Sequence, residues 1–222
     1  MIVIDVENAR AMLNSISLLL VATALASVLV RQLGSSILLL AGQGVLLAAT
    51  ATLVALATGA GHSYAAVAIT VAVKILIVPG VLLLVLREVS TKREVEAVIS
   101  QRLALMLAIG LVLVAYYVVG PLAPGDGFVT VNSLPAAMSM LLIGLLNMLI
   151  RKKAISQVIG IVAMENGLYL MAIVATQGLP LAVELGVAVD LAVGVMVMGF
   201  VARQIHRTFN SINTDRLQTL RG

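Results

Sequence analysis

Residues 154–176 read AISQVIGIVAMENGLYLMAIVAT, an apolar stretch with one charged side chain, Glu165, at its centre. A stretch of this length can cross the hydrocarbon core of a bilayer, which needs about 20 predominantly apolar residues. An acid at the centre of a membrane helix costs about 2.5–3.5 kcal/mol on insertion scales, so it is usually paired or functional. The segment therefore predicts a membrane helix that carries a buried carboxyl group.

Similar apolar stretches recur along the chain, which has 222 residues, 61% of them hydrophobic and only 11% charged. A soluble domain carries about 25% charged residues, so this composition excludes a soluble globule. Continuous apolar runs favour helices, because the strands of a membrane barrel alternate polar and apolar residues. We expect an all-α integral membrane protein, a bundle of about seven transmembrane helices. The expected spans are Met12–Val30, Ser35–Thr58, Tyr64–Leu86, Leu103–Gly120, Leu134–Ile150, Ala154–Thr176 and Leu181–Ala202.

The basic residues fall almost entirely on one side of this predicted bundle. The other side carries only Arg10, and only Lys74 lies inside a span. Since basic loops favour the cytoplasm, we expect the N-terminus outside and the C-terminus in the cytoplasm. An outer N-terminus that carries Asp5 and Glu7 is the wrong flank for a secretory signal, so we expect the first span to be retained. The basic side carries Arg31, Arg87, Lys92, Arg93, Arg102, Arg151, Lys152, Lys153, Arg203, Arg207, Arg216 and Arg221.

Two polar segments interrupt the apolar pattern. Arg87–Arg102 carries charges of both signs and is either a short amphipathic helix or a solvated linker. Pro121–Ser133 carries Pro and Gly turn signals and is the longest predicted outer loop. It divides the chain into a four-helix membrane part, residues 1–133, and a three-helix part with a basic cytoplasmic tail, residues 134–222.

Lys74 is the one base expected near the middle of the membrane. Pro79 follows five residues later, and its missing N–H leaves the carbonyl of Ile75 without a helical donor. The kink and the amine together predict a polar niche in an apolar helix. Lys74 would either take part in proton transfer or pair with a carboxylate and hold helices together.

The seventh span carries Asp190 at its centre and Glu184 near its outer end. Small residues every four positions, such as Gly186 and Gly194, share a stripe with Asp190, so another helix can approach there. Glu184 follows Pro180 by one turn, where interfacial water and the helix dipole can stabilise it. Glu184 is therefore either a solvated acid at the end of the helix or, in a secondary role, the outer exit of a proton path.

Glu165, Asp190 and Lys74 would thus share the middle of the membrane on three helices, an arrangement that suits a lateral proton relay. Tyr169 lies one turn after Glu165 on the same face, where its hydroxyl could bond the carboxyl group. Two further polar residues, Gln43 and Asn147, are expected to form hydrogen bonds between helices. A structural role explains each of them.

The chain contains no cysteine. Disulfides, thiolate catalysis and iron–sulfur ligation by this chain are therefore excluded. We expect no cofactor and no metal in this chain, and no catalytic residue. The charge pattern is that of membrane topology, and no aromatic and basic patch suggests a nucleic-acid partner.

The C-terminal 90 residues resemble the small three-span K (4L-type) subunit of respiratory complex I. Arg151-Lys152-Lys153 between two spans, Ile159-Gly160 with Asn166, and Asp190 with Gly194 carry the resemblance. Glu165 falls about one turn later than the usual glutamate of that family, which would sit near Val162, and Asp190 replaces a glutamate. The tail resembles the family most specifically, with His206-Arg207, Asn210, Ile212-Asn213, Asp215 and Arg221-Gly222.

With four further spans ahead and the sequence Glu165-Asn166-Gly167, the whole chain resembles hydrogenase-4 component E. The resemblance implies a non-catalytic membrane-arm subunit of a group 4 [NiFe] hydrogenase or formate hydrogenlyase-like complex in a prokaryotic cytoplasmic membrane. It places the [NiFe] and iron–sulfur centres on partner subunits and implies antiporter-like membrane subunits as neighbours. Protons would pass through Glu165 and Asp190, with Lys74 tuning them or extending the relay. The alternatives are a K-like subunit of a multisubunit cation/proton antiporter and a non-conducting membrane anchor.

Overall fold

A computed structural model of the chain describes residues 6–58, 67–68, 71–88, 97–122, 132–175 and 194. These residues are almost all helical, and β-type pairing among them is limited to isolated bridges such as that between Ala97 and Arg151. The all-α prediction is confirmed for this part of the chain. The helices are α1 (Val6–Leu29), α2 (Leu33–Thr58), the π-helix η1 (Ala72–Ile77) with α4 (Val78–Glu88), α5 (Gln101–Val119) with the 3-10 turn η2 (Gly120–Leu122), α6 (Ser133–Ile150) and α7 (Ala154–Ala175).

Five helices, α1, α2, α5, α6 and α7, are long and apolar enough to cross a membrane. They correspond to the first, second, fourth, fifth and sixth predicted spans. The third predicted span, Tyr64–Leu86, is described from residue 71 as η1 and α4. The seventh, Leu181–Ala202, lies outside the described residues except for Gly194, so the count of seven stays a prediction.

The helix bounds agree with the predicted spans to within two residues for α2, α5, α6 and α7. Helix α1 differs, because it begins at Val6 rather than Met12. Its first turns carry Glu7 and Arg10, polar residues that an apolar window leaves out. A helix can nevertheless continue through them, and Glu7 in the first turn interacts favourably with the helix dipole.

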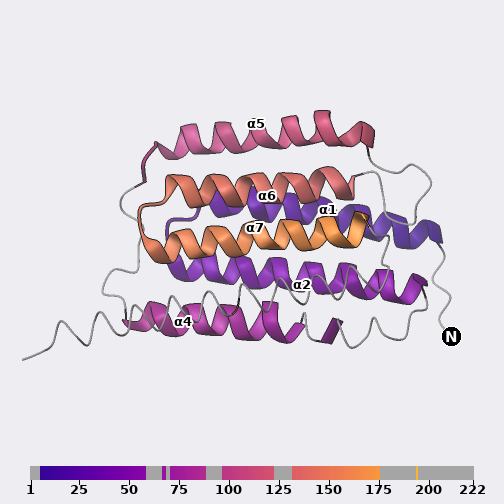
Figure 1. The fold of residues 1–222 in the computed structure, drawn as a ribbon, viewed down its shortest axis with the longest axis horizontal. Helices are drawn as coiled ribbons and strands as arrows, with labels where there is room; N and C mark the ends of the chain where they lie inside the picture. Colours follow the sequence, from indigo (N-terminus) through magenta and orange to yellow (C-terminus); the bar gives the residue numbers. More distant parts are fainter. Residues whose placement is uncertain are drawn as a thin grey trace, which may run out of the picture.

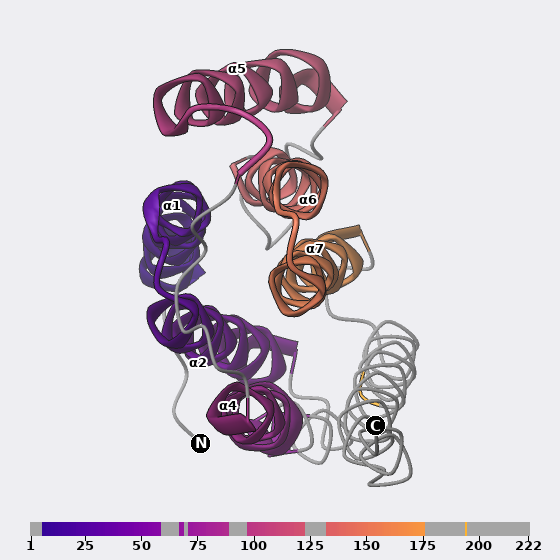
Figure 2. The same cartoon turned by 90° about the vertical axis from the view of Figure 1, so that its left-hand side faces the viewer.

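The helices lie side by side with similar directions (Figure 1). Seen along the bundle, α6 lies between α5, α1 and α7, and α2 lies beside α1, α7 and α4 (Figure 2). The contacts between α6 and α7 are the most extensive. These two helices form an antiparallel hairpin across the three residues 151–153.

Glycines allow α6 and α7 to approach so closely. A β-carbon added at Gly144 would collide with the backbone of Met164, and one at Gly167 would lie 2.5 Å from the backbone nitrogen of Leu141. Gly160 faces the α6 backbone in the same way. Close backbone contact through small residues is the usual means of packing helices in a membrane, where lipid is as apolar as the helix surfaces.

Three predicted basic loops meet at one end of the bundle. The Arg151 guanidinium donates to the carbonyls of Ser27, Val28 and Val30, at the end of α1. Ala97 pairs with Arg151, and the Gln101 side chain donates to the carbonyl of Leu29. The loops that the charge pattern places on one side therefore share one end, which we call the basic end. The described part of the Arg87–Arg102 segment, residues 97–100, docks there and leads into α5.

We predict that Gly144→Ala destabilises the protein by about 1–3 kcal/mol, the usual cost of overpacking a tight interface. The added methyl group would collide with the α7 backbone, which cannot move aside as a side chain can. Thermal unfolding of the detergent-solubilised protein measures the effect. Gly110→Ala in α5 is the control, because its methyl group would enter open space. Equal melting temperatures for the two variants would contradict the close α6–α7 contact.

Candidate functional site

Lys74 and Glu165 form an ion pair in the interior of the bundle. The Lys74 ammonium donates to both carboxylate oxygens of Glu165, each at 2.6 Å. Lys74 is 5% exposed and Glu165 is 4% exposed. Glu165 lies eleven residues after Ala154, where α7 begins, which is about 16 Å at 1.5 Å per residue. Both side chains are therefore buried, as predicted, and Lys74 pairs with a carboxylate. The proton-relay roles predicted for the two residues stay predictions.

The π-helix η1 carries Lys74 and ends just before Pro79. The N–H of Val78 donates to the carbonyl of Val73, a bond with π rather than α spacing. The next donor along the helix would be Pro79, which has no N–H, so the α-helical pattern is already disrupted at this place. π-turns of this kind are frequent at functional sites. Here the π-turn contains Lys74, the buried base of this helix.

Helix α2 approaches Lys74 through a glycine. A β-carbon at Gly44 would lie 2.9 Å from the Lys74 carbonyl oxygen and 3.1 Å from its Cβ. This contact is tighter than ordinary van der Waals contact, so a larger residue at position 44 would displace η1. The Gly-Gln-Gly sequence at residues 42–44 thus brings the α2 backbone against the base of the Lys74 side chain.

A hydrogen-bond network extends from the ion pair toward α2. The Lys74 ammonium also donates to Oδ1 of Asn166, at 3.0 Å, and Nδ2 of Asn166 donates to Oε1 of Gln43, at 3.1 Å. Both amides are at most 2% exposed. The expected interhelical role of Gln43 is confirmed, and Asn166 joins the charged pair to it. Lys74 thus donates to the side chains of two consecutive residues of α7.

Tyr169 contacts the pair through its ring. The Lys74 ammonium lies 4.9 Å from the ring centroid, within the range of a cation–π interaction. The position of Tyr169 one turn after Glu165 therefore gives it a place against the ammonium. The expected hydrogen bond from its hydroxyl to the carboxyl group stays a prediction.

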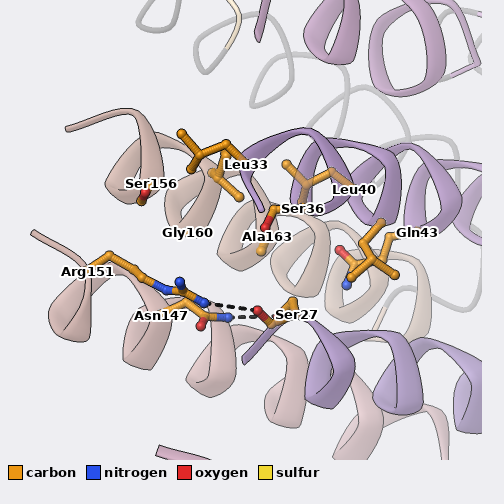
Figure 3. A pocket seen from close by; sticks show the side chains of 12 residues that line it. Ser27, Leu33, Ser36, Leu40, Gln43, Asn147, Arg151, Ser156, Gly160 and Ala163 are labelled. Atoms are coloured by element: carbon orange, nitrogen blue, oxygen red, sulfur yellow. Dashed lines mark hydrogen bonds between the residues drawn. The ribbon is translucent and has the colours of Figure 1, made fainter. Parts of the chain in front are cut away.

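A second polar cluster lies nearer the basic end (Figure 3). Nδ2 of Asn147 donates to the Ser27 hydroxyl at 2.8 Å, so the interhelical role expected of Asn147 is confirmed. Arg151 is also buried here, 9% exposed, and its guanidinium binds the α1 carbonyls. The sequence predicts only a topological role for Arg151, because nothing in Arg151-Lys152-Lys153 marks the first residue as buried.

Asp190 and Glu184 lie outside the described residues, so their predicted roles stay predictions. In the part of the chain that the structure describes, no three His, Asp or Glu side chains gather as a metal site would require. The described site residues are therefore Lys74, Glu165, Asn166 and Tyr169, with Gln43 added by the structure. The polar amide of Gln43 inside an apolar span predicts a hydrogen bond between helices, but it does not show that the bond leads to this site.

Comparison with known proteins finds homologues of this chain. The profile of NADH-ubiquinone/plastoquinone oxidoreductase chain 4L matches residues 133–222. An uncharacterized protein of Mycobacterium tuberculosis is 34% identical over 202 residues, which cover 89% of this chain and 91% of that protein. Hydrogenase-4 component E of Escherichia coli K12 is 29% identical over 149 residues, which cover 67% of this chain and 69% of that protein. The chain is therefore a homologue of hydrogenase-4 component E, and its C-terminal part, residues 133–222, matches the chain 4L family.

Hydrogenase-4 component E of Shigella flexneri matches with the same identity and coverage as the Escherichia coli protein. No solved structure matches the chain. The family and the apolar helices together identify a multi-pass membrane protein. Within it, the chain 4L-type region supplies Glu165 and Asn166, whereas Lys74 and Gln43 come from the helices that precede this region.

We predict that removing one partner of the buried pair destabilises the protein more than removing both. Lys74→Met leaves the Glu165 carboxylate buried without its counter-ion, and breaking a buried pair in this way costs about 3–5 kcal/mol. The double variant Lys74→Met/Glu165→Gln leaves no buried charge at these positions, so it should recover part of the loss. Melting temperatures in detergent measure all variants.

Lys152→Met is the control, because it removes a lysine that is exposed at the turn between α6 and α7. If the double variant lost as much melting temperature as Lys74→Met and Glu165→Gln lose together, the two side chains would not stabilise each other.

Proposed function

We propose that this chain is a membrane-arm subunit of an energy-converting [NiFe] hydrogenase-type complex related to respiratory complex I, and that it takes part in proton translocation. The Lys74–Glu165 pair is the observation that carries the proposal. It is a titratable acid and a base in direct contact, enclosed by η1, α2 and α7. Ionisable residues enclosed within membrane helices commonly mark proton relays.

The names of the relatives support the hydrogenase-type complex. Partners in this proposal are antiporter-like membrane subunits and a hydrogenase module that carries the [NiFe] and iron–sulfur centres. The location is a prokaryotic cytoplasmic membrane.

In the proposed mechanism, the position of Lys74 determines whether Glu165 can accept a proton. While the ammonium donates to both carboxylate oxygens, it occupies the sites where a proton would bind. When the ammonium moves away from Glu165, the carboxylate oxygens are open to accept a proton. Return of the ammonium favours release of that proton. Asp190 would be the second acid of the relay.

We predict that Glu165→Gln abolishes proton movement coupled to hydrogen oxidation or evolution, while turnover at the partner hydrogenase module persists. Glutamine keeps the size of the side chain but cannot carry the exchangeable acidic proton. Proton uptake by membrane vesicles that contain the whole complex, divided by hydrogen turnover, measures coupling. Glu7→Gln, at the exposed start of α1, is the matched control and should couple normally.

Unchanged coupling in Glu165→Gln would refute the relay. A static membrane anchor predicts a different pattern. In that case, neutralising both Glu165 and Asp190 would lower the amount of assembled complex but leave the ratio of protons to turnover unchanged.

The proposed orientation places the basic end in the cytoplasm and the start of α1 outside, as expected from the charge pattern. Because the chain has no cysteine, single thiols report their side of the membrane without background from this subunit. A thiol at Lys152→Cys should react with an impermeant maleimide only in inside-out vesicles, and one at Glu7→Cys only in right-side-out vesicles. The reverse pattern would overturn the orientation.

A further inference from the structure

A pocket links the basic end of the bundle with the network around the buried pair. Four helices, α1, α2, α6 and α7, form its walls. Figure 3 shows Arg151 at one end and Gln43 at the other. Gln43 bonds Asn166 and Asn166 bonds Lys74, so two hydrogen bonds separate the inner end of the pocket from the ammonium. The polar residues of the lining are Ser27, Ser36, Gln43, Asn147, Arg151 and Ser156.

Asn147 indicates what fills this pocket. Its Oδ1 atom is buried and has no hydrogen-bond partner among the described residues, although its Nδ2 atom bonds Ser27. A buried acceptor without a partner costs about 1–3 kcal/mol. Water is the usual partner in a polar site that is large enough to hold it. The cavity volume open to water here is about 20 Å³, enough to hold a water molecule beside these polar groups.

We propose that water held in this pocket, together with its polar side chains, forms a path by which protons pass between the basic end and the Lys74–Glu165 pair. The path rests on the proposed function, because it serves the same acid. Protons move along hydrogen-bonded water and polar side chains, and the lining supplies hydroxyls and amides between Arg151 and Gln43. One wall consists of α1 and α2, so the helices that precede the chain 4L-type region take part in delivering protons to the Lys74–Glu165 pair.

The positive charge of Arg151 does not close this path. Its guanidinium faces three carbonyls at the end of α1, where the helix dipole carries about half a negative charge. The apolar part of the lining, including Leu33, Leu40 and Ile159, keeps the path narrow. The chemistry of the lining therefore fits water and hydrated protons better than a large organic substrate.

Thiol reactivity tests whether the pocket is hydrated. Ala163→Cys places a thiol in the pocket wall nine residues after the start of α7, and Ile109→Cys places one on the outer face of α5, eight residues after its start. Both helices start at the basic end, so the two thiols lie at similar depth. The thiolate of the cysteine attacks methanethiosulfonate ethylammonium, forming a mixed disulfide and releasing methanesulfinate, and the thiolate forms in water and not in hydrocarbon. Leu40→Cys, on the opposite pocket wall, is a second probe should Ala163→Cys fold poorly.

With the whole complex in membranes, we expect Ala163→Cys or Leu40→Cys to react at least about tenfold faster than Ile109→Cys, as a hydrated thiol should. Mass spectrometry of this subunit measures the rates. Reacted Ala163→Cys should also lose coupled proton uptake, whereas reacted Ile109→Cys should keep it. Pocket thiols that react no faster than Ile109→Cys, or a reacted pocket that still couples, would overturn the path.

These results are independent of the test of the relay itself. If Glu165→Gln abolishes coupling but the pocket thiols are inert, protons reach Glu165 by another route and only the path is wrong. If the pocket thiols react but Glu165→Gln couples normally, the pocket is hydrated and the proposed function is wrong.

Discussion

A charge inside a membrane helix bundle needs a counter-ion, and the contact of Lys74 with Glu165 meets that requirement for both side chains. The contact restricts the helices that carry these side chains. Helix α2 must come close enough for Gly44 to touch the Lys74 backbone, and η1 must turn the ammonium toward α7. Asn166 and Gln43 then satisfy one another where they would otherwise be buried without partners.

The close contact of α6 with α7 supports the same site from the other side. Gly144 and Gly167 let the two backbones approach, which fixes the position of the α7 face that carries Glu165 and Asn166. Arg151 adds a restraint at the basic end, because its guanidinium ties the loop after α6 to the end of α1. The polar contacts thus join α1, α2, η1, α6 and α7 into one bundle around the pair.

Sequence alone predicts the helices well, because a membrane helix is defined mainly by the length of its apolar run. It also identifies Lys74 and Glu165 as buried, since a charge within such a run is visible without a structure. It does not identify them as partners, because the pattern of one helix does not say which neighbour it meets. The π-turn at Lys74 and the burial of Arg151 depend on contacts with other helices, and the pattern of a single helix does not contain those contacts.

The ion pair shows what the helices before the chain 4L-type region contribute to the site. The acid and its amide neighbour, Glu165 and Asn166, come from residues 133–222, the region that matches chain 4L. The base and the second amide, Lys74 and Gln43, come from the preceding helices. Without those helices, Glu165 would lack the described counter-ion, and a buried carboxylate would be neutral or would need another partner. The N-terminal helices therefore supply both the counter-ion of the acid and the second amide of the network.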